Sequence, residues 1–204
     1  ITNAFLPRFI NKKLKKVFEK GNIEGELIIP FDPNGSIGEN YGFFGKVSNA
    51  KINLNKKFSV KNLTAEISRE EGAEDKKINV IIKKGLFYDL DLSGSTMELK
   101  NNNNSKKIDI LLHTNGKINF SQIKKISSLF NFNTNFLKDL NGEANLKTNL
   151  VFQLNKKLKI KNLSYTIVGD LPYFELLTEE KNILKKYFPD YNPLIILKNT
   201  NIKF

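Results

Sequence analysis

The sequence predicts a mainly β protein with a few helices (α+β). We expect a long, curved antiparallel sheet of repeated hairpins that forms an open hydrophobic groove, with short helices at its ends or edge. From residue 22 onward, apolar and polar residues alternate over most of the chain, which is the period of a half-buried strand. Two stretches one hundred residues apart, 52–68 and 152–168, share Leu-Asn-Lys-Lys followed by Val or Ile and then Lys-Asn-Leu. Such self-similarity indicates a repeated structural unit, which we interpret as a β-hairpin.

Length and composition limit the class of protein. With 204 residues the chain is long enough for one large domain or two small ones. No apolar run in it reaches membrane-spanning length, and no signal peptide is visible in these residues. Because it begins at Ile1, we expect a piece of a longer polypeptide or a processed form, with any anchor or export signal upstream. The absence of cysteine excludes disulfides, thiol catalysis and cysteine-ligated metals.

The formal charge of +12 is compatible with nucleic-acid or anionic-membrane binding. It is explained more simply by a bias toward Lys, Asn and Ile, which is visible in the run Asn101 to Asn104. Nucleic-acid binding needs basic residues interleaved with exposed aromatic residues. Here the lysines are dispersed over turns and polar faces, so we expect no nucleic-acid partner.

Residues 4–20 are predicted to form a basic amphipathic helix that ends at Gly21. Its apolar stripe has three- and four-residue spacing and comprises Leu6, Phe9, Ile10, Leu14, Val17 and Phe18. Two interpretations stay open. The helix lies on an anionic membrane surface, or its stripe covers the end of a sheet.

Strand-like segments follow with turn signals between them. The strands predicted in the first group are 26–30, 41–44, 46–55 and 58–67. Turns are predicted at 32–35 and 55–57. The strands predicted in the second group are 78–82, 87–92, 97–99, 108–112 and 118–120. Turns are predicted at Lys84-Gly85, Ser93 to Ser95 and Asn115-Gly116.

The apolar positions change parity inside both copies of the repeat. Phe58 and Val60 are on one parity, whereas Leu63 and Ala65 are on the other. Because a one-residue slip would move every apolar side chain to the other face, we expect a β-bulge near Lys61-Asn62. The same slip at Lys161-Asn162 predicts a second bulge at the equivalent point.

The C-terminal half combines helices with the longest alternation. Ser121 is the predicted N-cap of a helical insert over 121–140, with a second short turn at 134–140. Strict alternation follows over 144–154, then the second repeat, a helix over 178–188 and a last strand from 194. We therefore expect residues 1–204 to form a single segment with repeat units at about 45–67 and 142–167.

The sequence offers no convincing catalytic group. His113 is the only histidine, and it lies at a predicted strand end. Asp89 and Asp91 share a strand face, where a solvated surface is favoured over acid–base or metal chemistry. We expect no enzyme activity, no cofactor and no metal.

The predicted sheet has one long apolar face that must be covered by another sheet, by helices or by a ligand. If the sheet curls, this face becomes a groove for acyl chains, each buried CH₂ contributing about 0.8 kcal/mol. The predicted lipid-contacting residues are Ile52, Leu54, Val80, Ile82, Leu90, Leu92, Ile108, Ile110, Leu112, Leu146, Leu150 and Leu154.

Two features carry a family resemblance. Gly45 to Ile67 and Gly142 to Ile167 share a pattern of glycine, alternating strand, turn, Leu/Ile-x-Val/Ile-x-Asn-Leu and a second strand. Leu137 to Gly142 forms a Leu-x-x-Leu-Asn-Gly run before a long strand. The chain thereby resembles the AsmA-like, TamB- and YhdP-related proteins of the Gram-negative envelope, over most of its length but through degenerate motifs.

The resemblance implies a segment of a large inner-membrane-anchored protein that crosses the periplasm. Such proteins carry phospholipid along a hydrophobic β-sheet groove toward the outer membrane. The implied partners are phospholipid acyl chains, the membrane through an anchor outside this chain, and envelope proteins. The alternative is a non-catalytic structural or assembly module for outer-membrane protein biogenesis, in which the same face packs dry against helices or another subunit.

Overall fold

The computed structural model describes residues 18–31, 33–35, 42–53, 59–69, 76–102, 105–129, 133–155, 160–179, 186–187 and 189–204. The protein is mainly β, as the sequence predicts. The strands are β1 (Phe18–Ile28), β2 (Gly42–Asn53), β3 (Ser59–Arg69), β4 (Lys76–Phe87), β5 (Leu90–Asp91), β6 (Thr96–Asn102), β7 (Ser105–Asn119), β8 (Leu137–Leu154), β9 (Ile160–Thr178) and β10 (Leu194–Lys203), with helix α2 at Phe120–Leu129.

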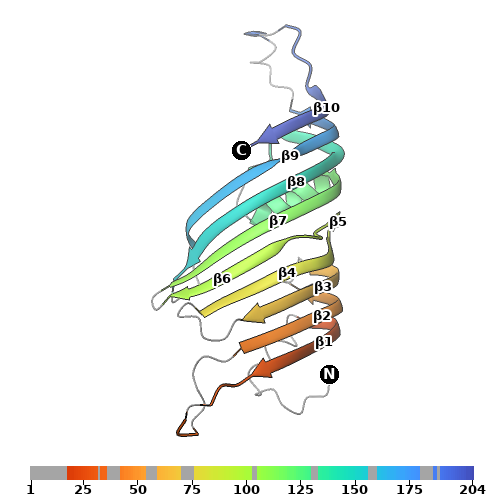
Figure 1. The fold of residues 1–204 in the computed structure, drawn as a ribbon. Coiled ribbons are helices and arrows are strands. Elements are labelled where there is room, and N and C mark those ends of the chain that lie inside the picture. Colours follow the sequence, from red (N-terminus) through yellow and green to blue (C-terminus); the bar gives the residue numbers. More distant parts are fainter. Residues whose placement is uncertain are drawn as a thin grey trace. The chain divides into compact units, whose positions relative to one another are not determined.

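The strands follow one another in space almost as they do in the sequence. Within the described residues, hydrogen bonds join ten strands in the order β1-β2-β3-β4-β5-β7-β8-β9-β10, and β6 pairs with β4 and β7 (Figure 1). The pairs β1–β2, β2–β3, β3–β4, β4–β6, β6–β7 and β9–β10 are antiparallel. This arrangement is that of successive hairpins, which need only short connections.

The chain divides into two compact units. Unit 1 comprises Ile1–Phe87, Asp91–His113 and Thr148–Thr166, and unit 2 comprises Tyr88–Leu90, Thr114–Lys147 and Ile167–Phe204. Each unit has its own cluster of buried apolar side chains. The ranges 45–67 and 142–167, predicted as repeat units, fall on β2–β3 and on β8–β9.

Two turns predicted from glycine are wrong. Lys84 and Gly85 lie inside β4, and the chain turns instead at Tyr88 and Asp89, whose φ angles are 50° and 68°. Asn115 and Gly116 lie inside β7, so residues 108–120 form no hairpin across them. Gly116 has φ 144°, and a Cβ there would lie 3.3 Å from the carbonyl oxygen of Asp89. Close backbone approach rather than a turn therefore accounts for this glycine.

The helix predicted for 4–20 lies mostly outside the described residues. Its last three residues, 18–20, belong to β1, and Gly21 continues that strand instead of ending a helix. The helix predicted for 178–188 also lies largely outside them, apart from Thr178, which ends β9, and the helical residues 186–187. At residues 18–20 and at Thr178, strand pairing overrides the predicted helical period.

Helix α2 confirms the first part of the predicted insert at 121–140, but its cap is different. The Asn119 side chain accepts a hydrogen bond from the Gln122 N–H at 3.0 Å, and the Gln122 side chain accepts one from the Asn119 N–H at 2.8 Å. This reciprocal pair is a capping box, so Asn119 rather than Ser121 is the N-cap. The short turn predicted at 134–140 is confirmed only over 134–137, where the Leu137 N–H donates to the Thr134 carbonyl oxygen at 3.0 Å. From Leu137 onward the chain is β8, which buries both Leu137 and Leu140.

The bulge predicted at Lys61-Asn62 is confirmed by the register of β2 and β3. Lys61 and Asn62 lie opposite the single residue Lys51, between the pairs Ala50↔Leu63 and Ile52↔Val60. Asn62 has φ 52°, in the left-handed region that asparagine tolerates. At the second position, Lys161-Asn162, Asn162 has the matching φ of 51°.

Irregular backbone crosses the neighbouring strands of unit 1 at the same level. Asn49 and Ala50 lie opposite Gly21 of β1, and Asn62 and Leu63 lie opposite Gly85 of β4. A Cβ at Gly21 would come within 2.6 Å of the Ala50 Cα, so only glycine fits. Bulges increase strand bend and twist, and β2, β3 and β4 curve toward one end in Figure 1.

Candidate apolar binding surface

The apolar side chains of unit 1 gather on one side of its strands. The buried members, here called the unit 1 core, are Val47, Ala50, Val60, Leu63, Ala65 and Leu92. Half-buried side chains pack against them from β1, β2, β3, β4 and β7: Phe18, Ile52, Ile67, Val80, Ile82, Phe87 and Leu112. Within the described residues, every one of these side chains comes from a strand or from the loop after β5.

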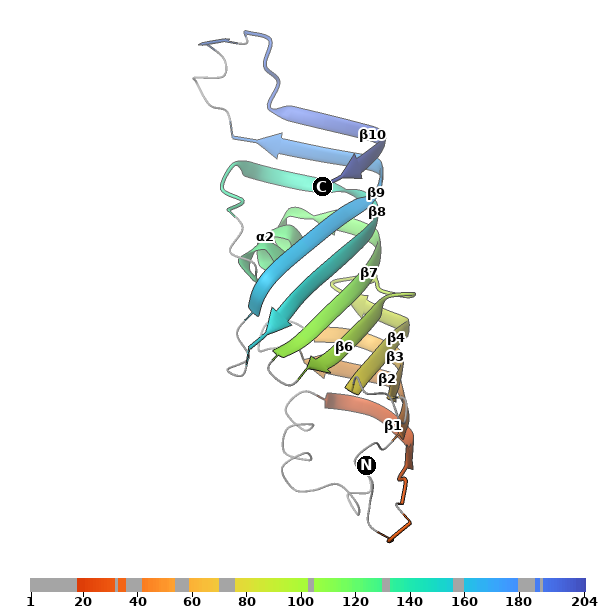
Figure 2. The same cartoon turned by 60° about the vertical axis from the view of Figure 1, so that its left-hand side comes forward.

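Unit 2 has a second core, and a helix contributes to it. Its buried members, here called the unit 2 core, are Leu90, Ile118, Leu137, Leu140, Ala144, Leu171 and Phe174. Phe120 and Ile123 of α2 pack against this core. Figure 2 shows α2 on one side of the sheet beside β8 and β9. The apolar face of unit 2 is therefore covered, at least in part, by the chain's own helix.

A buried polar clamp fixes the beginning of α2. The Gln122 side chain, 8% exposed, donates through Nε2 to the Tyr88 carbonyl oxygen at 2.5 Å. The Lys125 ammonium lies 5.4 Å from the centre of the Tyr88 ring, within cation–π range. Together with the capping box, these contacts tie α2 to the turn between β4 and β5.

The twelve residues predicted to line a groove divide between several environments. Ile52, Val80, Ile82, Leu92 and Leu112 are brought together in or against the unit 1 core. Leu90 belongs to the unit 2 core, and Leu146 packs against it. Ile108 is buried outside both cores, whereas Ile110, Leu150 and Leu154 are half-buried. Leu54 lies outside the described residues.

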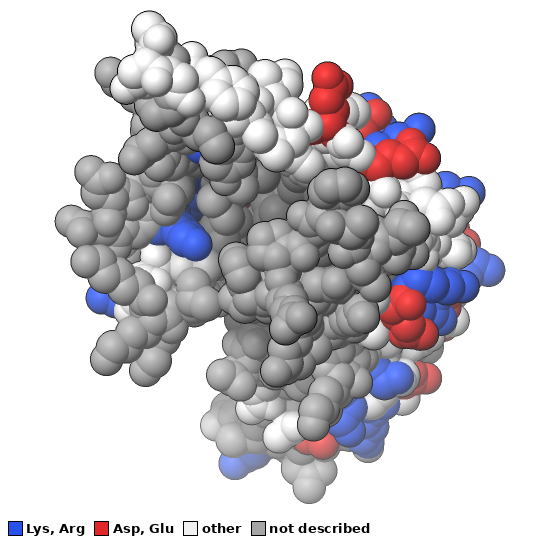
Figure 3. Space-filling model, turned by 90° about the horizontal axis from the view of Figure 1, so that it is seen from below, with Lys and Arg blue, Asp and Glu red and all other residues white. Residues whose placement is uncertain are grey.

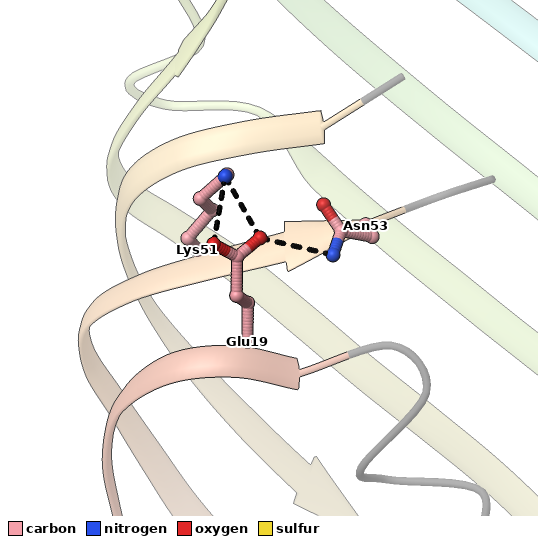
Figure 4. A network of polar contacts seen from close by, with 3 residues as sticks. All are labelled: Glu19, Lys51 and Asn53. Atoms are coloured by element: carbon pink, nitrogen blue, oxygen red, sulfur yellow. Dashed lines mark hydrogen bonds and ion pairs between the residues drawn. The ribbon is translucent and has the colours of Figure 1, made fainter. Parts of the chain in front are cut away.

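Charged side chains gather along one side of the molecule seen from below (Figure 3). On β1 and β2, Glu19 accepts hydrogen bonds from Lys51 Nζ at 2.9 Å and Asn53 Nδ2 at 3.1 Å (Figure 4). Both hydrogen bonds lower the pKa of Glu19, and the one from Lys51 has the larger effect. On β6, Glu98 pairs with Lys77 at 2.5 Å and Lys100 at 3.0 Å, and both contacts lower its pKa.

Two of the polar residues considered for catalysis make local hydrogen bonds, Asp91 through its side chain and His113 through its backbone. Asp91 Oδ1 accepts hydrogen bonds from the Ser93 hydroxyl at 2.7 Å and the Ser93 N–H at 3.0 Å, which lower its pKa. The backbone of His113 is bridged by the Ser95 hydroxyl, which accepts from its N–H and donates to its carbonyl. Asp89 is an exposed turn residue. No cluster of metal-ligating side chains occurs within the described ranges.

Sequence reasoning placed Ala50, Ala65 and Ala144 in the apolar alternation of their strands but did not predict how deeply they are buried. Ala50 is fully buried, and Ala65 and Ala144 are nearly so. Alanine is compatible with either face of a strand, so alternation alone does not predict burial this complete. Gln122 was also missed, although Asn119-x-x-Gln122 carries the spacing of a capping box.

Comparison with known proteins gives no match to a family model, to a curated protein or to a solved structure. Among the helices described, none has the length and apolarity that crossing a membrane requires.

Proposed function

We propose that this chain is a lipid-carrying segment in which phospholipid acyl chains lie along the apolar face of unit 1. The observation that carries the proposal is the convergence of half-buried apolar side chains from β2, β4 and β7 on the unit 1 core. Side chains with this partial exposure offer an acyl chain both an apolar surface and access. Burial of about ten methylene groups would contribute roughly 8 kcal/mol before the cost of ordering the lipid.

The row of backbone irregularities supports a curved sheet. Gly21, Asn49, Asn62 and Gly85 lie at one level across β1 to β4. Because bulges bend the strands that carry them, the two bulges bend β2 and β3 at the same level. The apolar side chains on the inner side of such a bend form the wall of a groove.

In this proposal the segment belongs to a larger protein of the periplasm that is anchored to the inner membrane, as the family resemblance implies. The groove passes phospholipid toward the outer membrane, and other envelope proteins are partners. The segment has no catalytic role. Fold alone does not specify function, so the proposal depends on lipid being captured at named positions.

A second function, a structural or assembly module, is favoured by the packing of unit 2. Phe120 and Ile123 of α2 occupy its apolar face, and the Gln122 clamp holds the helix there. In a structural module the apolar face is covered by protein instead of lipid, and here α2 provides such a cover. We therefore assign acyl chains to unit 1 and not to the unit 2 core.

The test is site-specific photo-crosslinking in cells, followed by mass spectrometry of the attached lipid. A photoreactive residue at Ile110 or Val80, both half-buried, should capture phospholipid. The control is the same probe at Lys107, which is exposed on β7 one residue from Ile108. Capture at neither apolar position, or equal capture at Lys107, would reject the groove and leave the assembly module.

A further inference from the structure

The two outermost strands of the described sheet each have one strand neighbour. β1 pairs with β2, and β10 pairs with β9. Both strands expose large apolar side chains, which is unusual for an edge, because edge strands are normally protected by charge, proline or covering elements. The exposed residues are Ile23, Leu27 and Ile28 on β1 and Leu194, Ile195 and Ile196 on β10.

These two strands are complementary in charge as well as in apolarity. β1 carries three glutamates and one lysine, whereas β10 carries two lysines and no acidic residue. On β1 the carboxylates precede the apolar end, which includes Leu27 and Ile28. On β10 the apolar end, residues 194–196, precedes Lys198 and Lys203. The two patterns are therefore reversed with respect to each other.

We propose that β10 of one copy of this chain pairs with β1 of a second copy as antiparallel strands. Reversed patterns match when strands run in opposite directions. The alignment that sets Lys198 opposite Glu24 also sets Ile195 opposite Leu27 and Leu194 opposite Ile28. Directly opposed residues lie on the same side of a sheet and touch, so each of these pairs is favourable.

The competing arrangements lack this match. A parallel pairing of β10 with β1 would place residues 194–196 beside the charged end of β1 and leave Leu27 and Ile28 beside Lys203. Antiparallel pairing of β10 with another β10 over its full length would place Leu194 opposite Lys203 and would give neither lysine an acidic partner. Glu19 is already engaged by Lys51 at 2.7 Å, and Glu26 lies opposite Ile196 in this alignment, so Glu24 is the carboxylate that serves the contact.

The absence of cysteine from the chain allows a direct geometric test. Full-length Leu27→Cys and Ile195→Cys variants, one of them carrying a mass tag, are mixed and oxidised mildly. Opposed residues have Cβ atoms about 5 Å apart, within reach of a disulfide, so the mixed disulfide should form. The control mixes Ile195→Cys with Ile23→Cys, which would lie about 13 Å further along the strand.

Charge reversal gives an independent test by sedimentation velocity over a range of concentrations. Glu24→Lys should weaken self-association about tenfold, because an attraction becomes a repulsion. Adding Lys198→Glu to the same chain should restore association. Each contact joins β1 of one copy to β10 of another, so the two reversed charges again attract each other. Glu143→Lys, on an exposed position of the interior strand β8, makes the same change in net charge and should leave association unaltered.

Folding is checked for each variant by far-ultraviolet circular dichroism. A chain that stays monomeric at all concentrations overturns the proposal. So do a preference for Ile195–Ile195 disulfides, equal cross-linking at Ile23, or a charge-reversed pair that fails to recover. None of these outcomes bears on lipid capture at Ile110 or Val80, so the two proposals fail separately.

Discussion

Asn49 of β2 and Asn62 of β3 form two bulges that compensate each other. Ser48 and Asn49 lie opposite Thr64, and Lys61 and Asn62 lie opposite Lys51. Each asparagine has a positive φ, 50° and 52°. Because one bulge adds a residue to β2 and the other adds one to β3, the register is the same on both sides of the irregularity. Apolar side chains thus reach the unit 1 core from both sides of it.

The left-handed conformation of Asn62 predicts the result of substitution there. Asn62→Val should lower the free energy of unfolding by about 1–2 kcal/mol, because a β-branched residue clashes in this region. Asn62→Gly should change it little. Urea unfolding measures both, and Lys61→Val is the control on the neighbouring exposed residue. Equal effects of the two valine substitutions would contradict the assigned conformation.

The α2 clamp predicts unequal roles for three neighbouring residues. Asn119→Ala should cost about 1 kcal/mol through loss of the cap. Gln122→Ala should cost more, about 2–3 kcal/mol, because it also leaves the Tyr88 carbonyl without this donor. Ser121→Ala, at an exposed position, should be nearly neutral. Thermal unfolding followed at 222 nm separates them, and a large effect of Ser121→Ala would restore it as the cap.

The two repeats predict a contrast between equivalent leucines. Leu63 is 7% exposed in the unit 1 core, whereas Leu163, at the same place in the second repeat, is 46% exposed. Leu63→Ala should therefore cost about 2–5 kcal/mol through lost burial and a cavity. Leu163→Ala should stay within about 0.5 kcal/mol. Chemical denaturation of both variants checks this, and similar losses would contradict the difference in burial.

The lowered pKa of Glu98 predicts a pH-dependent contribution to stability. A carboxylate whose folded pKa is lowered stabilises the fold above its unfolded pKa, about 4.3, and loses that contribution as pH falls through the folded value. The wild type should therefore be more stable than Glu98→Gln at neutral pH, and the difference should vanish in acid. Thermal midpoints measured from about pH 7 to pH 3 test this, with Glu143→Gln as the control. A difference that persists in acid would indicate packing and not charge.

Much of the fold follows from local patterns. Period-two alternation predicted β-structure along most of the chain because one face of each strand is apolar. The parity change at Lys61-Asn62 predicted a bulge because no regular strand can bury both sets of residues. Gly85 and Gly116 misled the turn assignment, since glycine also permits close backbone contact inside a strand. That contact depends on a neighbouring strand, which the local sequence does not specify.

The sequence by itself determined most of the strands and the bulge at Lys61-Asn62, because alternation and its change of parity depend on residues within a few positions of one another. Only the tertiary structure decided which apolar residues are buried. Val60 is 8% exposed and Ile160 is 58% exposed, although the two occupy the same place in nearly identical motifs. Burial depends on what packs against a face, and distant segments supply those neighbours: Val60 lies in the unit 1 core among side chains of other strands, whereas Ile160 belongs to neither core.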